Sequence, residues 1–208
     1  MSIAPTIEDV TRALRGTLPG APAQQRMVTL PRPTMAEFEH EGPPRPGAVL
    51  ILLYPEKGEL YLPLTLRTDR VATHKGQISL PGGAQELEDA SPWETALREA
   101  REEIGIDPAK VRPLGALSPL FIPTSNFHVY PFVGYQGEPP GFCPDPNEVA
   151  EVILLPLRGI LEPSAKGHET WLLRGRETEV SFYRYQQHVI WGATAMILSE
   201  LEALLEGD

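Results

Sequence analysis

The chain has 208 residues, with 18 Lys and Arg against 28 Asp and Glu and a formal net charge of −10. This length predicts one principal domain with its own core. An acidic chain without a basic cluster disfavours nucleic acid and anionic membrane surfaces as partners. Its apolar runs are too short to cross a bilayer, and we expect no secretory leader. The single Cys143 excludes an internal disulfide and a cysteine zinc site, so we expect a cytoplasmic location.

Proline is the unusual residue type, with 23 in the chain, about twice the ordinary share. Apolar residues at helical spacing predict a helix over residues 7–18. Residues 20–46 are rich in proline and predict an irregular arm that wraps the domain or a partner subunit. We therefore divide the chain into a helix and arm over residues 1–45 and a main domain over 46–208, and expect a homodimer that uses the arm.

The main domain alternates strands with few helices. Residues 47–54 and 59–67 predict a hairpin, and residues 77–80 lead into Pro81. Ser91 and Pro92 open a helix that Gly105 ends. The further elements expected are strands at 114–120, 127–135 and 148–156, a hairpin of 170–173 with 180–185, and a closing helix at 193–205. This order predicts an α/β (α+β) sandwich around a mixed β-sheet.

The helix that follows Ser91 carries three neighbouring carboxylates. At about 100° per residue, Glu99, Glu102 and Glu103 share an arc of about 100° beside the apolar stripe. Like charges this close repel one another and raise their pKa values. A hard divalent cation such as Mg²⁺ or Mn²⁺ would reverse that repulsion and would suit a phosphate substrate. The alternative is a solvated acidic face with Arg98 and Arg101 as partners.

The residues around these acids favour the metal site. Gly82 and Gly83 stand between a strand and the helix, where a backbone needs unusual dihedrals or a close approach to other atoms. From Arg98 to Ile106 the sequence reads REAREEIGI. This segment resembles the second half of the Nudix box, G-x5-E-x7-R-E-U-x-E-E-x-G-U, at every fixed position. The first half departs, because eight residues separate Asp89 from Arg98 where the box has seven.

The resemblance implies a Nudix fold and metal-dependent hydrolysis of a nucleoside diphosphate linked to another moiety. It implies that Glu99 and Glu103 are the main metal ligands and that Glu102 is a further ligand or a partner of the water. It implies that Arg98 orients the carboxylates through an ion pair. Water must attack phosphorus while negative charge gathers on the phosphate oxygens, and metals neutralise that charge and lower the pKa of bound water.

The segments before and after the box are similar to the coenzyme A pyrophosphatase subgroup. That subgroup reads roughly L-T-x-R-S-x3-R-x3-G-Q-x-x-F-P-G-G, and this chain has LTLR at 64–67 and GQISLPGG at 76–83. Thr68, Ala72 and Leu80 replace its Ser, second Arg and Phe. Downstream, SNF at 125–127 and IWGATA at 190–195 also match.

This resemblance implies cleavage of coenzyme A or its thioesters into adenosine 3′,5′-bisphosphate and 4′-phosphopantetheine. The expected substrate contacts are Arg67, Arg70, Lys75, Gly82 and Gly83. Arg184 is a further candidate for a 3′-phosphate, and Arg67 and Arg70 can equally form surface ion pairs. The alternatives are hydrolysis of ADP-ribose or a similar compound, and a non-catalytic Nudix module that binds a nucleotide.

Three remaining features carry weaker expectations. His74 stands beside the glycine loop in the sequence and is the one histidine that is a candidate for the site. Trp191 is expected to be a core residue, and Phe182, Tyr183 and Tyr185 are expected to pack in the fold rather than to contact an adenine. Residues 86–103 hold seven acids and two arginines, so half of the net charge of −10 lies in the segment that would hold cations.

Overall fold

The computed structural model describes residues 4–38, 40, 42–68 and 77–207. Arg70, His74 and Lys75 lie outside these residues, so the expectations that rest on them lie outside the structure. No helix of the described part is long and apolar enough to cross a membrane.

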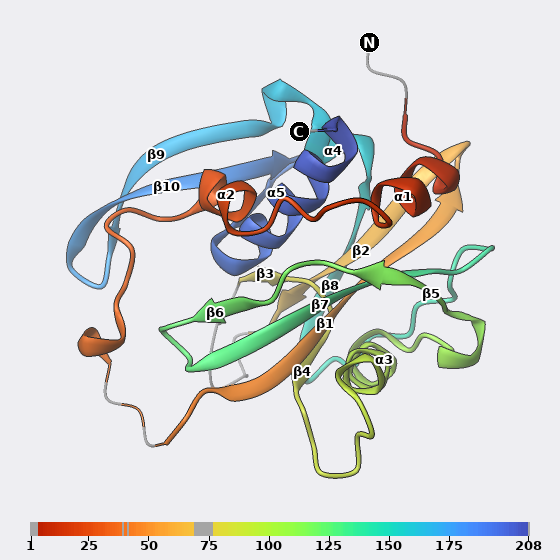
Figure 1. Cartoon of the computed structure of the whole chain (residues 1–208), viewed down its shortest axis with the longest axis horizontal. Helices are drawn as coiled ribbons and strands as arrows, with labels where there is room; N and C mark the ends of the chain where they lie inside the picture. Colours follow the sequence, from red (N-terminus) through yellow and green to blue (C-terminus); the bar gives the residue numbers. More distant parts are fainter. Residues whose placement is uncertain (1–3, 39, 41, 69–76, 208) are drawn as a thin grey trace.

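Eight strands of the described chain form one mixed sheet (Figure 1). Their bounds are β1 Arg45–Glu56, β2 Glu59–Arg67, β3 Ile78–Ser79, β4 Gly82–Ala84, β5 Arg112–Ala116, β6 Leu120–Ile122, β7 Phe127–Tyr135 and β8 Val149–Pro156. The order is β3-β2-β1-β7-β5, with β4 beside β1, β6 beside β7 and β8 beside β2. β1 and β7 run parallel, and the other pairs are antiparallel.

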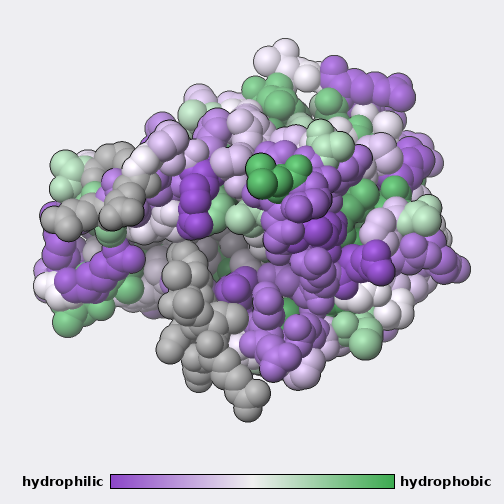
Figure 2. Space-filling model, turned by 90° about the horizontal axis from the view of Figure 1, so that it is seen from below, coloured by the Kyte–Doolittle hydropathy of each residue, from purple (hydrophilic) through white to green (hydrophobic). Residues whose placement is uncertain are grey.

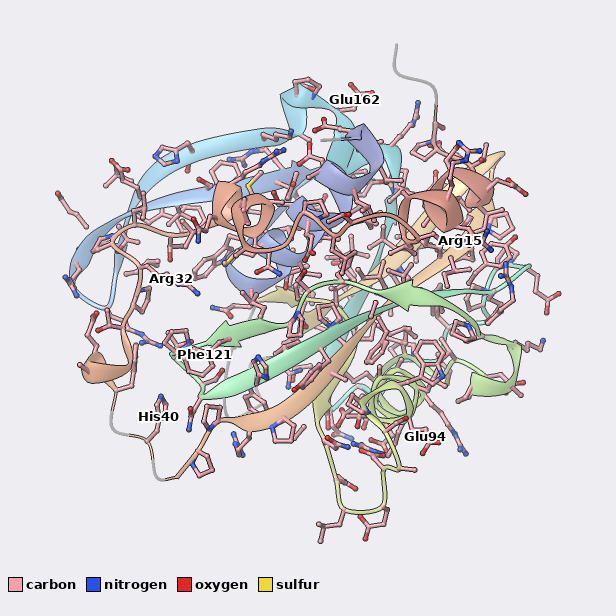
Figure 3. All side chains as sticks on the ribbon, viewed as in Figure 1. Arg15, Arg32, His40, Glu94, Phe121 and Glu162 are labelled. Atoms are coloured by element: carbon pink, nitrogen blue, oxygen red, sulfur yellow. The ribbon has the colours of Figure 1, made fainter. Side chains whose placement is uncertain are left out.

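Helices cover both faces of this sheet (Figure 1). The helix α3 (Pro92–Ile104) packs on one face through an apolar cluster that includes Ala96, Ala100 and Ile104. The helix α5 (Gly192–Glu206) packs on the other face within the larger cluster. Side chains fill the space on both faces of the sheet (Figure 3). The expected sandwich around a mixed sheet is therefore confirmed.

A second, antiparallel sheet lies beside α5 and contains β9 (Lys166–Leu173), β10 (Arg176–Tyr185) and β11 (His188–Trp191). The hairpin of β9 and β10 turns at Arg174 and Gly175, as the sequence predicts. The sequence did not predict β11 or the short helix α4 (Arg158–Leu161).

Several predicted boundaries need correction. The helix predicted over 7–18 is α1 (Ile7–Ala13), and its last turn passes into backbone bonds from Arg15 and Gly16 to the third residue before each. The single strand predicted over 114–120 is wrong. The chain leaves β7 after Leu117, because the Ser118 N–H donates to the Glu200 carboxylate of α5 at 3.1 Å and Pro119 has no N–H, and it pairs with β7 again at β6.

The proline-rich arm packs against the body of its own chain. It contains α2 (Ala21–Gln24) and the 3₁₀ turns Gln25–Met27 and Met35–Glu37. The Glu200 carboxylate of α5 is fully buried and accepts hydrogen bonds from the Gly20 N–H at 3.1 Å and from Gln24 Nε2 at 2.9 Å. The Ser118 N–H is a third donor, at 3.1 Å and 3.2 Å to its two oxygens. One buried carboxylate thus joins the arm, the loop before β6 and α5.

Candidate active site

Local signals fix the start and the end of α3. The Ser91 hydroxyl accepts the Glu94 N–H at 3.3 Å, and Pro92 takes the first turn, where no backbone donor is needed. Gly105 ends the helix in the left-handed region at φ 73°. An added Cβ there would also lie 2.8 Å from Cys143. Both the left-handed backbone and the close contact with Cys143 therefore favour glycine at this position.

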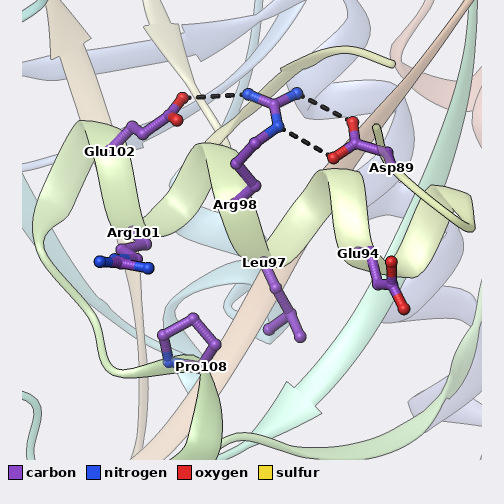
Figure 4. Close-up of a pocket in the computed structure, with 7 residues that line it drawn as sticks. All are labelled: Asp89, Glu94, Leu97, Arg98, Arg101, Glu102 and Pro108. Atoms are coloured by element: carbon purple, nitrogen blue, oxygen red, sulfur yellow. Dashed lines mark hydrogen bonds and ion pairs between the residues drawn. The ribbon is translucent and has the colours of Figure 1, made fainter. Parts of the chain in front are cut away.

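Arg98 gathers three carboxylates of the site, and Figure 4 draws two of them, Asp89 and Glu102. Its Nε and Nη2 donate to the two oxygens of Asp89, each at 3.0 Å. Its Nη1 donates to both Glu99 Oε1 and Glu102 Oε2, again at 3.0 Å. The bond from Arg98 lowers the pKa of Asp89 to about 2, and that same bond raises the pKa of Arg98. Arg98 therefore forms ion pairs with Asp89 in the acidic loop and with Glu99 and Glu102 on the helix, while its part in a reaction stays a prediction.

Asp89 thus stands as a partner of Arg98. Its carboxylate also accepts the Thr95 hydroxyl at 2.9 Å and the Glu86 N–H at 3.0 Å, so both oxygens are engaged. The sequence left open whether Asp89 takes the first acidic position of the box. The bidentate pair with Arg98 gives it a positioning contact in spite of the one-residue difference in spacing.

Glu103 is the most buried of the three glutamates, with 2% of its surface exposed. Its carboxylate accepts the Gly82 N–H at 3.1 Å and Arg67 Nη1 at 3.1 Å. Burial raises the pKa of Glu103 to about 7 against these two favourable contacts, and the charges of Glu99 and Glu148 add to the rise. Burial likewise raises the pKa of Glu99. Arg67 is thus the partner of a buried carboxylate rather than a surface charge.

The two glycines of the loop allow the backbone to approach the acids. A Cβ on Gly83 would lie 2.6 Å from the carboxylate of Glu99. Gly82 has φ +154°, and a Cβ there would lie 2.2 Å from the Ala48 carbonyl oxygen. The expected role of both glycines was substrate contact, and their observed contacts are with the β1 backbone and the carboxylates.

The donor chemistry of this cluster fits a hard divalent cation. Glu99 and Glu102 meet at one arginine nitrogen, and burial and mutual repulsion disfavour the charged forms of Glu99 and Glu103. Positive charge is therefore favoured here beyond what the arginines supply. No three His, Cys, Asp or Glu side chains of the described chain are already gathered as a metal site. Arg98 bonds one oxygen each of Glu99 and Glu102, whereas Arg67 and the Gly82 N–H bond one oxygen each of Glu103, so a cation would have to share carboxylate oxygens with these donors.

Sequence reasoning missed Glu148, which directly precedes β8. It is exposed, and its charge raises the pKa of both Glu99 and Glu103. Backbone bonds hold it near Arg67, because the Thr68 N–H donates to the Glu148 carbonyl at 2.9 Å. The only sequence signal was an acid at the start of a predicted strand, which says nothing about distance to a helix 45 residues earlier in the chain.

The remaining candidates are not brought to this cluster. Arg184 pairs with Glu169 at 3.2 Å within the second sheet. Phe182 and Tyr183 are buried, and Trp191 lies edge-on to Trp171 with ring centroids 5.5 Å apart. These aromatic side chains serve packing, as expected.

A shallow hollow of about 550 Å³ lies on the outer face of α3 (Figure 4). Its lining residues are Asp89, Glu94, Leu97, Arg98, Arg101, Glu102 and Pro108. Glu102, with 59% of its side chain exposed, is the carboxylate that the cluster turns toward solvent.

Comparisons with known proteins place the chain in a family. The description "NUDIX domain" matches residues 44–174. The uncharacterized Nudix hydrolase NudL of Photorhabdus laumondii is 42% identical over 140 residues, which are 66% of this chain and 73% of that protein. The chloroplastic Nudix hydrolase 22 of Arabidopsis thaliana is 38% identical over 162 residues, 74% of this chain but only 53% of that protein's length.

Solved structures agree on the fold. A NUDIX hydrolase from Nitrosomonas europaea superposes with a TM-score of 0.51 at 18% identity, covering 80% of this chain and 73% of that one. Nudix hydrolases act on pyrophosphate bonds of nucleoside diphosphate derivatives and generally use divalent metal ions. The domain match and the relatives show that the chain belongs to the Nudix hydrolase family.

Proposed function

We propose that the protein hydrolyses the pyrophosphate of coenzyme A or its thioesters, giving adenosine 3′,5′-bisphosphate and 4′-phosphopantetheine. One observation carries the proposal. The two segments that resemble the coenzyme A subgroup, 64–67 and 76–83, both contact the box through Glu103: Arg67 by its guanidinium and Gly82 by its N–H. The contact of this subgroup signature with Glu103 supports a role for the signature in the proposed reaction.

In this proposal Glu99 and Glu103 are the main ligands of Mg²⁺ or Mn²⁺, with Glu102 as a further ligand or a partner of the attacking water. Bound metal would neutralise phosphate charge and lower the pKa of water. Water adds its oxygen to one phosphorus, the bridging P–O bond breaks, and the proton passes to the leaving phosphate. Arg98 holds Glu99, Glu102 and the Asp89 loop in place, and Arg67 holds Glu103.

A polyanionic substrate needs basic contacts on a chain of net charge −10. Arg67, Arg70 and Lys75 remain the proposed contacts, with the backbone of Gly82 and Gly83 at the edge of the site. Arg184 is less suited to this role, because it lies on β10 of the second sheet and pairs there with Glu169 rather than with a carboxylate of the box.

The same proposal covers the organisation of the whole chain. Residues 46–208 form the catalytic domain, and residues 1–45 form the arm. The absence of a disulfide framework in the sequence suits a reducing compartment such as the cytoplasm. The homodimer remains a proposal, because the described arm contacts its own chain.

Product analysis tests the function. The protein is incubated with coenzyme A and with ADP-ribose, each with Mg²⁺ or Mn²⁺ and with chelator. We expect the two coenzyme A products, in a reaction that requires metal. Faster turnover of ADP-ribose would overturn the substrate, and the absence of both turnover and metal binding would favour a non-catalytic nucleotide-binding module.

A further inference from the structure

The large sheet carries a row of three aromatic side chains on the face that α3 covers in part. Tyr130 of β7 packs at the edge of the apolar cluster under α3. His128 shares this face, because it lies two residues earlier on the same strand. Phe121 of β6 pairs with His128 and lies on the same face. All three side chains are half-buried, and we call them the aromatic row.

The strand register places the aromatic row beside the carboxylate cluster. Tyr130 lies opposite Ala48 of β1, and Ala48 lies opposite Gly83 of β4. Side chains at paired positions point to one face of a sheet, and a Cβ on Gly83 would lie 2.6 Å from the Glu99 carboxylate. Tyr130 is therefore two strand spacings, about 10 Å, from the place where β4 meets Glu99.

The helix α3 does not extend over the aromatic row. Figure 1 shows the turn between β6 and β7 extending beyond α3, and Figure 3 shows Phe121 at this end of the sheet, apart from Glu94 at the start of the helix. Phe132, two residues after Tyr130, instead packs edge-on against Trp93 of α3 with ring centroids 5.6 Å apart. The aromatic row thus begins where the contact of β7 with α3 ends.

Two rings of the row orient one another. His128 Nδ1 and the Tyr130 hydroxyl lie 3.1 Å apart in a hydrogen bond, and the rings meet edge-on with centroids 5.0 Å apart. Pro46 of β1 is exposed and lies opposite His128. The row therefore offers ring and apolar surface together with hydrogen-bonding groups. Figure 2 views the molecule from the side of α3, where the surface is otherwise mainly hydrophilic.

The parts of a nucleotide need different surroundings. Its phosphates need positive charge, and Arg67 lies on the β2 side of β1. Its base is a flat, uncharged ring system that stacks on aromatic side chains, histidine included. One ribose and its 5′ carbon join the base to the nearer phosphate, so the base must rest close to the carboxylates. The aromatic row, on the β7 side of β1, meets this requirement.

We infer that the aromatic row binds the adenine base of the substrate, which stacks on His128 and Tyr130. This inference rests on the proposed function and adds a specificity subsite to it. The adenosine half of coenzyme A then lies on the β7 side of the carboxylates, and the phosphopantetheine half extends away from the row. A base other than adenine loses the hydrogen bonds that the hydroxyl and imidazole groups make to the adenine edge.

Separate titration of the two products tests which half of the substrate the row contacts. Tyr130→Leu removes the ring and keeps apolar volume under α3. By calorimetry in Mg²⁺, we expect its affinity for adenosine 3′,5′-bisphosphate to fall about tenfold, and its affinity for 4′-phosphopantetheine to change less than about twofold. With coenzyme A the loss appears in KM while kcat is kept. Tyr130→Phe keeps the ring and should retain most of the affinity.

Phe132→Leu is the matched control, because Phe132 is an aromatic residue on the same strand and face that packs on Trp93. It should lower stability and leave both affinities unchanged. The inference is overturned if Tyr130→Leu or the wild type gives no sign of adenosine specificity: unchanged affinity for adenosine 3′,5′-bisphosphate in the variant, equal loss for both products, or no binding to the wild type.

Failure of the proposed function has a different result. If the wild type does not cleave coenzyme A but binds adenosine 3′,5′-bisphosphate, and Tyr130→Leu weakens that binding, the proposed substrate is overturned and the adenine subsite stands. A loss of affinity in Phe132→Leu equal to that in Tyr130→Leu would show a general effect on the sheet and would overturn the subsite.

Discussion

At the scale of single residues, Glu103 combines near-complete burial with a charge. Its pKa of about 7 lies above the ordinary value of 4.5, because burial disfavours the carboxylate. A raised carboxyl pKa stabilises the fold fully below pH 4.5, and that stability is lost as the pH rises through about 7. Without metal, the protein therefore carries a destabilising charge at neutral pH, which a bound cation would relieve.

Glu103→Gln tests this balance in two measurements. With chelator present, raising the pH from 4.5 to 8 should lower the unfolding free energy of the wild type by about 2–3 kcal/mol more than that of the variant. The melting temperature of the wild type should therefore fall further than that of the variant. Turnover should drop by about 10² or more, because the proposed metal ligand is lost. Mg²⁺ should raise the melting temperature of the wild type alone.

Glu94→Gln is the control on the same helix, since Glu94 is exposed and caps the Ala90 N–H rather than facing the cluster. It should keep near-normal turnover and the pH profile of the wild type. Near-normal turnover in Glu103→Gln would remove Glu103 from the proposed metal site, whatever its effect on stability.

Asp89 has the opposite shift, and its prediction has the opposite sign. Arg98 lowers its pKa to about 2 from 3.8, so the pair stabilises the fold above pH 3.8, and this stability is lost as the pH falls through about 2. Asp89→Asn should destabilise the protein by about 1–2 kcal/mol at pH 7, and the difference from wild type should shrink below pH 3.8. Denaturant unfolding at pH 7 and pH 3 measures it. An equal difference at both values would mean that the charge of Asp89 does not matter.

At the scale of elements, the short strand β4 brings glycine backbone against α3. Gly83→Ala should cut turnover strongly, because its Cβ would displace the Glu99 carboxylate now 2.6 Å away. Its stability should change by less than about 1 kcal/mol, since a side chain can move. Gly82→Ala should instead destabilise by about 2 kcal/mol or more, because its Cβ meets fixed backbone of β1 and its φ is strained.

Thermal unfolding and turnover of the two variants separate these effects. Gly83→Ala with wild-type activity would show that Glu99 can leave its present position without consequence. Gly82→Ala with wild-type stability would show that β1 yields at Val49, against the close contact seen there.

Elements with local signals were predictable from the sequence. Ser91 and Pro92 mark the start of α3, and Gly105 marks its end. The bounds of β7 match the predicted residues 127–135. The break between β5 and β6 was not, because it depends on the bond from the Ser118 N–H to the carboxylate of Glu200, 82 positions later in the chain.

The candidate site divides in the same way. Arg98 and its neighbours on one helix follow from spacing of about 3.6 residues per turn. Arg67 lies 36 positions from Glu103, and Glu148 lies 45 positions beyond it, so their approach to Glu103 depends on how β2 and β8 pair. A pattern along the chain gives residue types at those positions but no distances between them.

At the scale of the whole molecule, the arm and the acidic segment lie on different sides of the large sheet. Half of the net charge of −10 belongs to residues 86–103, around α3. The arm instead joins α5 on the opposite face, through Glu200. A substitution that weakens the contacts of the arm should therefore lower the unfolding free energy. It should reduce turnover only to the extent that the protein unfolds.

The substitution Glu200→Gln tests whether the arm contributes to stability through this carboxylate. The buried carboxylate accepts N–H groups from Gly20, Gln24 and Ser118, so an amide would direct a donor at these donors. We expect a loss of about 2–4 kcal/mol in urea unfolding and earlier proteolysis of the arm. Glu206→Gln, on the same helix, removes only a partly exposed ion pair with Arg26 at 3.8 Å and should cost less than about 0.5 kcal/mol. If Glu200→Gln and Glu206→Gln were equally stable, the buried carboxylate would contribute nothing, and the arm would be held by its other contacts, such as the Ser199 hydroxyl on the Ala23 carbonyl and the paired backbones of Leu30 and Glu179.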